Sequence, residues 1–432
     1  MTQEHFVTQE RFVKNSDLDS FGNSGSSRSA TSLAERWARN AMLRLLAQLK
    51  HGSLTLEEGG QVLHFGEARQ QAALRATIRI SDASVWLDLL RNGSIGAGEA
   101  YMQEKWDTPD LLQVIRLFVA NMAVLQRLER SAMKRHALRL WHWLRHNSRS
   151  GARRNIAAHY DLGNDFFRLF LDDTMAYSAG IFARATDNLH EASLAKFERI
   201  CTQLRLKPED HLLEIGTGWG GLAIHAARHY GCRVTTTTLS REQAAYAREW
   251  IAREGLGDRI TVLERDYREL DGCYDKLVSV EMIEAVGARY YPEYFRRCSQ
   301  LLKPDGLMML QAITISDQRY AASVAGTDFI KRYVFPGGQL PCNSEITRQV
   351  ALHTDMQLVD LKDITYDYAL TLRTWRERFH DTLAEARQLG YDETFLRMWR
   401  FYLCFCEGGF LERVIHTGQF LLAKPGWRPV SD

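Results

Sequence analysis

Short apolar runs alternate with amphipathic helical stretches in the second half of the chain. Apolar strands are predicted at 211–216, 233–239, 260–266, 275–281 and 307–313. Helical periodicity separates them at 222–231, 241–255 and 292–306. Parallel strands need long crossover connections, and helices supply these while covering the sheet. The alternation therefore predicts an α/β domain with a mainly parallel sheet over residues 155–432.

The first 154 residues follow a different pattern. Residues 1–32 are rich in Ser, Gly and Asn after position 15 and predict a disordered leader. Residues 33–126 begin with an amphipathic helix that we expect to end at Gly52, followed by short alternating runs and further helices. This pattern predicts a small α+β N-terminal domain.

Residues 127–154 combine nine Lys and Arg residues with a single acidic residue, Glu129, and with Trp141 and Trp143. They predict a basic amphipathic linker helix. One interpretation places it on anionic phospholipid, with tryptophan at the interface. The other is a solvated linker whose arginine stems cover the next domain. RNA binding is a weaker interpretation, because 55 basic and 53 acidic residues leave the chain almost neutral.

Cysteine usage and the N-terminus indicate a compartment. The seven cysteines include no C-x-x-C pair, so neither a disulfide framework nor a metal site is expected. The N-terminus lacks the apolar segment of a signal peptide, and no run approaches the roughly 20 apolar residues that span a bilayer. We expect a cytoplasmic protein that would reach lipid from the inner membrane surface.

A glycine-rich turn follows the predicted strand at 211–216. Gly216, Gly218 and Gly221 satisfy G-x-G-x-x-G, which permits a tight turn and close approach of a ligand to a helix N-terminus. A dinucleotide site fits this pattern. Three features favour S-adenosylmethionine instead. Glu214 precedes the glycines, where a carboxylate attracts a cationic ligand. Residues 235–240 lack the acid that a nicotinamide ribose needs, and Asp266-Tyr267 follows the third strand at a plausible adenine edge.

Together with further segments, this turn resembles the cyclopropane fatty acid synthase family. The segments are His159–Phe167, Met175–Ser178, Glu214–Gly221, Thr238–Ser240 with Gln243, and Lys331–Gly338. Members are S-adenosylmethionine-dependent C-methyltransferases that act on unsaturated acyl chains of phospholipids. The resemblance implies a Rossmann-like class I methyltransferase fold behind a small N-terminal domain, and it leaves a homodimer open.

The resemblance also implies the cofactor site. Its residues would be Tyr160, Tyr177, Ser178, Glu214, Gly216, Gly218, Trp219, Gly220, Thr238, Gln243, Asp266 and Tyr267. In this interpretation Thr238 and Gln243 replace the missing ribose acid. The aromatic residues Tyr177, Tyr333, Phe335, Tyr402 and Phe410 are candidates for an acyl tunnel.

Catalysis requires a base, since the alkene attacks the sulfonium methyl and the resulting cation must lose a proton before a ring closes. In the family a bound bicarbonate is thought to be that base. Its ligands would here be Glu284, Tyr368, Gln311 and the backbone of Ile313. Glu281, three residues before Glu284, is interpreted as an ordinary helix-face acid.

This chain departs from the family at the anion site. Ala179 stands where the family has a cysteine, Gln311 where it has a histidine, and Ala285 where a histidine often follows the carboxylate. The expected reaction is cyclopropane formation on a cis double bond. The alternative is C-methylation without ring closure, giving a methyl-branched or methylene product. An RNA methyltransferase and a lipid-binding protein without turnover are the rivals; we expect no nucleic-acid partner.

Overall fold

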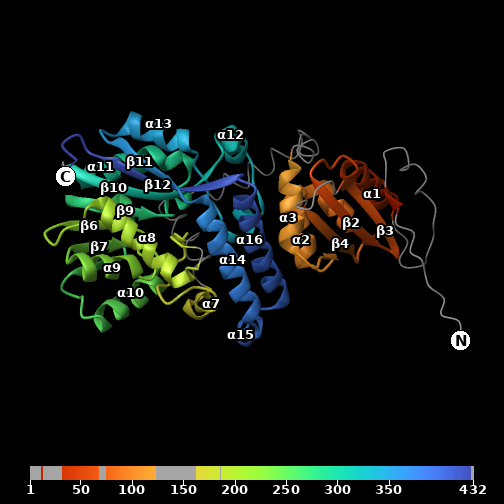
Figure 1. Cartoon of the computed structure of the whole chain (residues 1–432), viewed down its shortest axis with the longest axis horizontal. Coiled ribbons are helices and arrows are strands. Elements are labelled where there is room, and N and C mark those ends of the chain that lie inside the picture. Colours follow the sequence, from red (N-terminus) through yellow and green to blue (C-terminus); the bar gives the residue numbers. More distant parts are fainter. Residues whose placement is uncertain (1–10, 13–31, 68–73, 123–161, 185, 430–432) are drawn as a thin grey trace, which may run out of the picture. The chain divides into compact units, whose positions relative to one another are not determined.

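The computed structural model describes residues 11–12, 32–67, 74–122, 162–184 and 186–429 (Figure 1). These residues form two compact units. The first comprises the described residues up to 122 together with Tyr391–Glu412, and the second comprises 162–390 and 413–429. The segment Tyr391–Glu412, which the sequence analysis placed in the C-terminal domain, thus packs with the N-terminal one. The predicted linker 127–154 lies outside the described residues, as does most of the predicted leader.

The first unit has α+β architecture. Its sheet has the order β1-β3-β2-β4-β5, in which β2 pairs antiparallel with β3 and parallel with β4. The strands are β1 (Arg11–Phe12), β2 (Gly52–Glu58), β3 (Gln61–Glu67), β4 (Arg75–Ile80) and β5 (Trp106–Asp107). The helices are α1 (Leu33–Leu46), α2 (Val85–Met102), α3 (Leu111–Ala120) and α16 (Glu393–Leu411).

Helix α1 begins where the sequence provides a capping box and ends earlier than predicted. Ser32 and Glu35 exchange side-chain and backbone hydrogen bonds at its N-terminus. The helix ends at Leu46, and Gly52 already belongs to β2. The buried Asn121 side chain accepts from the backbone amides of Lys50 and His51, which draws the chain out of the helix.

Buried polar contacts connect α16 to the first unit. The Arg397 guanidinium donates to the carbonyls of Tyr101 and Trp106 at 2.6 and 3.2 Å, and it lies 3.9 Å from the centre of the Tyr101 ring. Arg116 pairs with Glu412 at 2.7 Å. These contacts explain why a helix distant in sequence completes this unit.

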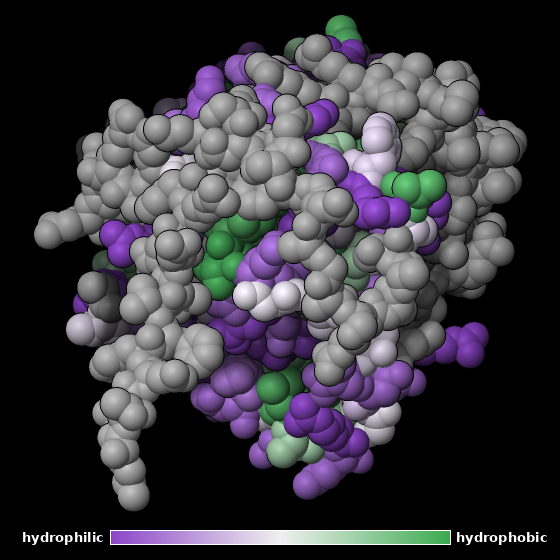
Figure 2. Space-filling view, turned by 90° about the vertical axis from the view of Figure 1, so that its right-hand side faces the viewer, coloured by the Kyte–Doolittle hydropathy of each residue, from purple (hydrophilic) through white to green (hydrophobic). Residues whose placement is uncertain are grey.

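Exposed apolar residues of the first unit include Leu33 and Trp37, both on α1. On the face that Figure 2 shows, the described residues are mostly hydrophilic, and hydrophobic ones occur as separate small patches. Within the described ranges, no helix is both long and apolar enough to cross a bilayer.

The second unit contains the predicted α/β fold with a mainly parallel sheet, which is confirmed. Its seven strands have the order β11-β12-β10-β9-β6-β7-β8; the run from β10 to β8 is parallel and β12 is antiparallel to both neighbours. The strands are β6 (His211–Ile215), β7 (Arg233–Thr237), β8 (Ile260–Leu263), β9 (Tyr274–Val280), β10 (Leu302–Ile315), β11 (Gln357–Asp363) and β12 (Ile415–Ala423).

Helices cover both faces of this sheet, because its strands are apolar on both sides. Leu212 faces a core with α8 (Leu189–Leu204), α9 (Gly221–Tyr230) and α10 (Arg241–Arg253). Leu213 faces the opposite core with α11 (Tyr291–Leu301) and α13 (Asn343–His353). The second unit also contains α7 (Asn164–Arg168), α12 (Asp317–Ala325), α14 (Thr365–Asp381), α15 (Leu383–Gln388) and the short turns η2 (Tyr267–Glu269), η3 (Ile283–Ala285), η4 (Ala288–Tyr290) and η5 (Ile330–Val334).

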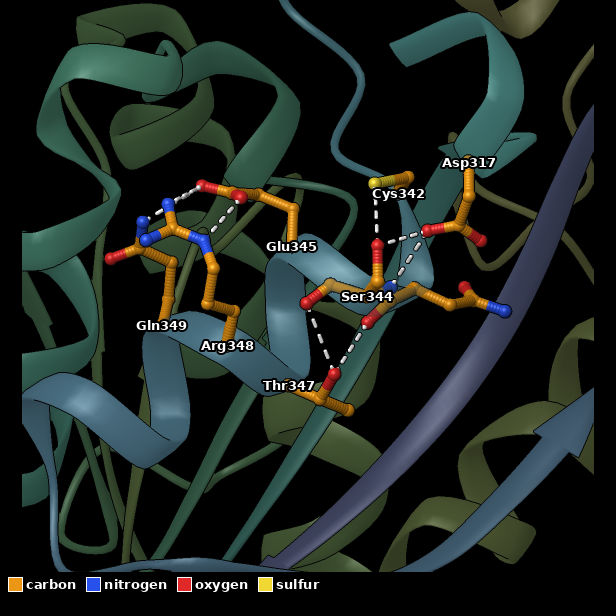
Figure 3. A network of polar contacts seen from close by, with 8 residues as sticks. Asp317, Cys342, Ser344, Glu345, Thr347, Arg348 and Gln349 are labelled. Atoms are coloured by element: carbon orange, nitrogen blue, oxygen red, sulfur yellow. Dashed lines mark hydrogen bonds and ion pairs between the residues drawn. The ribbon is translucent and has the colours of Figure 1, made fainter. Parts of the chain in front are cut away.

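A polar network fixes the start of α13 (Figure 3). The Asp317 carboxylate accepts from the backbone amide and hydroxyl of Ser344, and Glu345 pairs with Arg348 one turn further on. The backbone from 336 to 342 leads from η5 to this anchored start of α13. This stretch matters for the site, since Gln339 donates its amide to the carbonyl of Glu284.

The strand order places a topological switch point between β6 and β9. From β6 the chain proceeds to β7 and β8 on one side, and β9 and β10 then fill the other side. Ligands of open α/β sheets bind outside the carboxyl ends of strands at such a point. The loops after β6 and β9 are therefore where a site is expected.

Candidate active site

The glycine turn after β6 forms an open cradle. Gly218 has a φ of +52°, and a Cβ added there would meet no described atom within 4 Å. Gly221 differs, because an added Cβ would lie 2.6 Å from the carbonyl oxygen of Thr174. Gly218 therefore leaves room for a ligand beside the backbone, whereas Gly221 permits close packing of α9.

Glu214 lies beneath this turn at the end of β6. The residue is 3% exposed, and the Thr236 hydroxyl lies 2.6 Å from its Oε2 and 2.7 Å from the Thr217 hydroxyl. Burial raises the pKa of Glu214 to about 8, against the opposing effect of the Thr236 hydrogen bond. Among the described residues no basic side chain forms an ion pair with it. A buried acid without a cationic partner suits a cationic ligand.

Trp219 joins the turn to a cluster of aromatic rings. Its indole nitrogen donates to the Asn164 side chain at 2.7 Å, and its ring lies 5.0 Å from that of Phe167. Phe167 also contacts Tyr177, which stacks on Trp375 at 5.1 Å. This cluster supplies an apolar, π-rich wall next to the cradle.

The predicted ribose and adenine residues follow β7 and β8. Thr238 donates to Gln243 at 3.0 Å, and both side chains are buried. Asp266 forms a two-pronged ion pair with Arg268, at 2.7 and 2.6 Å. Tyr267 is buried against Tyr294, and burial raises its pKa well above the ordinary value. Their contact with a cofactor remains a prediction.

Ser178 and Lys196 form a buried polar pair close by. The Lys196 ammonium, fully buried, donates to the Ser178 hydroxyl at 2.7 Å. Burial lowers the pKa of Lys196 to about 8, and the negative charges of Glu281 and Asp172 oppose this.

Tyr160, also predicted to hold the cofactor, lies outside the described residues. Tyr333 lies in η5 and Phe335 directly follows it, while Tyr402 and Phe410 lie on α16 in the first unit.

Glu281 is the centre of the predicted anion cluster. Its Oε1 accepts from the backbone amide of Ala179 at 2.9 Å and from the Gln311 side chain at 2.8 Å. Its Oε2 accepts from the Tyr368 hydroxyl at 2.8 Å. Burial raises the pKa of Glu281, while these donors and Lys196 act in the opposite direction.

The interpretation of Glu281 as a helix-face acid is therefore wrong. Glu281 follows β9 directly, has a φ of +49° and is not helical. The spacing to Glu284 imitates a helical repeat, but the chain turns here through the short η3. A carboxylate placed immediately after an apolar strand was the sequence signal that pointed to the carboxyl edge of the sheet.

Glu284 lies beside this cluster. Its Oε1 accepts from the backbone amide of Ile313, and its Oε2 is a buried atom without a hydrogen-bond partner in the described part of the chain. Burial, followed by the nearby charge of Glu281, raises its pKa to about 8. Such a carboxylate has a lone pair available and holds a proton more tightly than usual, which suits a general base.

The structure thus brings together the four residues that the family resemblance assigned to a bicarbonate site, but their donors face the protein's own acids. Tyr368 and Gln311 donate to Glu281, and Ile313 donates to Glu284. Ala179 has no side-chain donor. A bicarbonate would meet occupied donors and two carboxylates, so the residues present do not fit that anion. The described residues also contain no cluster suited to a metal ion.

A parallel sheet that switches between β6 and β9, with an acid and a glycine cradle at the switch, defines a class I S-adenosylmethionine-dependent methyltransferase. The comparison with known proteins gives the narrower assignment. The family model "Mycolic acid cyclopropane synthetase" matches residues 147–420, and the chain belongs to this family.

The chain aligns with most of the length of several known relatives. The chain is 40% identical over 354 residues to the tuberculostearic acid methyltransferase UfaA1 of Mycobacterium tuberculosis, covering 78% of this chain and 80% of the relative. It is 36% identical over 355 residues to the cyclopropane-fatty-acyl-phospholipid synthase of Escherichia coli, covering 81% and 88%.

Solved structures of two cyclopropane synthases also match this chain. The cyclopropane synthase MmaA2 from Mycobacterium tuberculosis matches with a TM-score of 0.59 at 32% identity, over 63% of this chain and 98% of that one. The mycolic acid cyclopropane synthase CmaA1, complexed with SAH and CTAB, matches with a TM-score of 0.59 at 30% identity, over 63% and 98%. The protein is therefore a methyltransferase that uses S-adenosylmethionine to modify lipid acyl chains, and the predicted family and class are confirmed.

Proposed function

We propose that this enzyme methylates the cis double bond of an unsaturated phospholipid acyl chain and closes a cyclopropane ring. The observation that carries the proposal is the pairing of a cofactor cradle after β6 with a buried, hydrogen-bond-free carboxylate oxygen of Glu284 after β9. The Escherichia coli relative, named for phospholipid acyl chains, supports this substrate.

The cradle suits S-adenosylmethionine, which supplies an electrophilic methyl group when bound. Glu214 would attract its cationic groups, Gly218 would let it approach the backbone, and Thr238 with Gln243 would hold the ribose. Trp219 and the rings behind it would keep water from the reacting carbon. Dryness matters because water competes with the weak alkene nucleophile and traps the cation.

The cation that forms on the acyl chain needs stabilisation and then a base. Tyr177, which is half-buried and stacks on the fully buried Trp375, would offer a π-rich face that attracts a cation by about 0.5–2 kcal/mol. Glu281 adds a nearby negative charge. The Glu284 Oε2 then takes a proton from the added methyl, and the electron pair of that C–H bond closes the ring.

Methyl transfer without ring closure is the second candidate. Its support is Ala179, which lacks the thiol that the family resemblance leads one to expect, and Gln311, whose side chain is fully engaged with Glu281 and Gln419. The relative named as a tuberculostearic acid methyltransferase supports the same alternative. In this case the cation would lose a proton from the chain.

We further propose that the enzyme works on the cytoplasmic side of the inner membrane, with the basic segment 127–154 contacting anionic headgroups. Removing anionic lipid from vesicles would then lower the rate, and rising salt would lower it further. Equal rates on neutral and anionic vesicles would refute the electrostatic part of this proposal.

Incubating the purified full chain with methyl-labelled S-adenosylmethionine and unsaturated phospholipid vesicles tests the function. Label is expected in the fatty acids of wild type and of Glu209→Gln, an exposed acid before the amino end of β6. Glu284→Gln is expected to lose it. Fully saturated vesicles are the substrate control, and label in their acyl chains would contradict attack by a double bond.

A further inference from the structure

Glu281 occupies the position where the family resemblance places an external anion. Three donors from separate elements converge on its carboxylate: the Ala179 amide, the Gln311 side chain and the Tyr368 hydroxyl, at 2.8–2.9 Å. Three donors around one planar carboxylate are the arrangement that a bound bicarbonate would require. The side chain is attached to the protein, however, so no ligand is needed to satisfy them.

The backbone at Glu281 is strained in a way that supports a special role. Its φ of +49° lies in the left-handed region, which is unfavourable for a residue with a side chain. The peptide is held there because the Glu281 amide donates to the Gln311 carbonyl at 2.8 Å, just beyond the register pair of Gln311 with Val280. This geometry directs the carboxylate into the three donors.

Charge balance argues against a further anion beside this carboxylate. The charge of Glu281 already acts on Glu284, and both residues are half-buried. Lys196 is the described cation whose charge acts on Glu281, and it donates to Ser178. An added bicarbonate would place another negative charge beside the Glu281 carboxylate, with one ammonium nearby in a site of low dielectric constant, which is unfavourable.

We propose that Glu281 replaces bicarbonate in this enzyme, so that methyl transfer needs no external anion and Glu284 receives the proton. This inference rests on the proposed function. Glu281 is a positioning residue. Its carboxylate stands where the anion would bind and orients Tyr368 and Gln311, and its negative charge increases the basicity of Glu284. In the step itself a C–H bond of the added methyl breaks, an O–H bond forms on Glu284, and the released electron pair becomes the new C–C bond.

The test compares wild type with Glu281→Gly in buffer freed of carbon dioxide. Glycine tolerates the positive φ, so the variant should fold, which circular dichroism and thermal melting will check. Wild type should keep its rate, and added bicarbonate should change that rate less than about twofold. Glu281→Gly should lose at least about tenfold, and bicarbonate or formate should restore at least about fivefold, because the three donors are then open to an anion.

Controls separate rescue from general effects. Glu209→Gly carries the same substitution in an exposed turn and should respond to neither depletion nor bicarbonate. Sodium chloride at equal ionic strength should rescue nothing. Wild type that loses activity on depletion and regains it with bicarbonate would overturn the inference, and so would a folded Glu281→Gly without any response.

A binding measurement keeps the inference testable apart from turnover. Calorimetric titration of formate should show binding to Glu281→Gly and none to wild type. The reverse pattern, or equal binding to both, would contradict the occupied anion place. Absence of lipid methylation by wild type in every buffer would refute the proposed function alone, since the titration would still decide the role of Glu281.

Discussion

Replacing Glu214 by Gln should remove a proton linkage from cofactor binding. Glu214 is buried under the glycine turn, and burial raises its pKa from 4.5 to about 8. Most of the free enzyme therefore holds a proton on this group at pH 7. A cationic cofactor prefers the ionised form, so binding must expel that proton.

The magnitude follows from the pKa. With a value of about 8, roughly one molecule in a hundred is ionised at pH 6, one in ten at pH 7 and half at pH 8. The dissociation constant of S-adenosylmethionine should thus fall by about fiftyfold from pH 6 to pH 8. Glu214→Gln carries no ionisable group there, so its dissociation constant should change little over this range. At pH 8 it should bind at least about tenfold more weakly than wild type.

Isothermal titration calorimetry measures both quantities. At pH 7, repeating the titration in two buffers of different ionisation enthalpy should show the release of nearly one proton by wild type and almost none by Glu214→Gln. A wild-type affinity that is flat between pH 6 and 8, or the same slope in both proteins, would refute the assignment of Glu214 to the cationic part of the cofactor.

Other predictions concern turnover, the cradle and stability. Glu284→Gln should lower turnover at least about a hundredfold while cofactor affinity changes less than about twofold, and equal losses in calorimetry and turnover would indicate a structural role. Gly218→Ala should lower the free energy of unfolding by about 1 kcal/mol and should weaken the binding free energy of the cofactor by more than that. A larger loss in unfolding than in binding would contradict a cradle. Urea unfolding should show the free energy of unfolding falling as pH rises from about 4.5 to 8, because the folded chain keeps protons on Glu214 and Glu284 that the unfolded chain releases. Each group contributes about 1.4 kcal/mol per pH unit to this fall. Glu214→Gln should therefore show a shallower dependence on pH, and an unchanged one would argue against this explanation. Arg397→Met should destabilise the first unit by about 2–4 kcal/mol in thermal melts, because two buried carbonyls lose their donor, and a loss below about 0.5 kcal/mol would show that α16 is held by apolar packing alone.

The parallel sheet could be read from the sequence because its strands are apolar on both faces. Leu212 and Leu213, or Met308 and Met309, face opposite cores, which produces continuous apolar runs rather than alternation. Glycines and capping residues then mark where each strand ends. Local signals of this kind need no knowledge of the rest of the chain.

The partner of α16 could not be read in this way. Its apolar run around residues 401–406 indicates burial but does not say against which surface. Arg397 contacts carbonyls almost 300 positions away in sequence, and only the folded chain shows them. The same reason explains why the domain boundary drawn from pattern alone included this helix.

The same distinction between local signals and contacts of distant segments applies to the candidate site. The glycine turn, Glu214 and the Thr238–Gln243 pair lie within short segments, and the structure brings them to one edge of the sheet. The role of Glu281 could not be predicted, because its donors come from three distant parts of the chain: Ala179, Gln311 and Tyr368. Its separation from Glu284 resembles a helix turn, and the positive φ that breaks the helix is a property of the folded backbone.

The fate of the transferred methyl tests the central claim most directly. Unsaturated phospholipid vesicles treated with enzyme and S-adenosylmethionine bearing a fully deuterated methyl group would be analysed by mass spectrometry of their fatty acids, before and after mild hydrogenation. Ring closure with proton removal from the methyl predicts a product that keeps two of the three deuterium atoms and takes up no hydrogen. A product that keeps all three, or that hydrogenation reduces, would contradict cyclopropane formation, and acyl chains without deuterium would contradict methylation of the lipid itself.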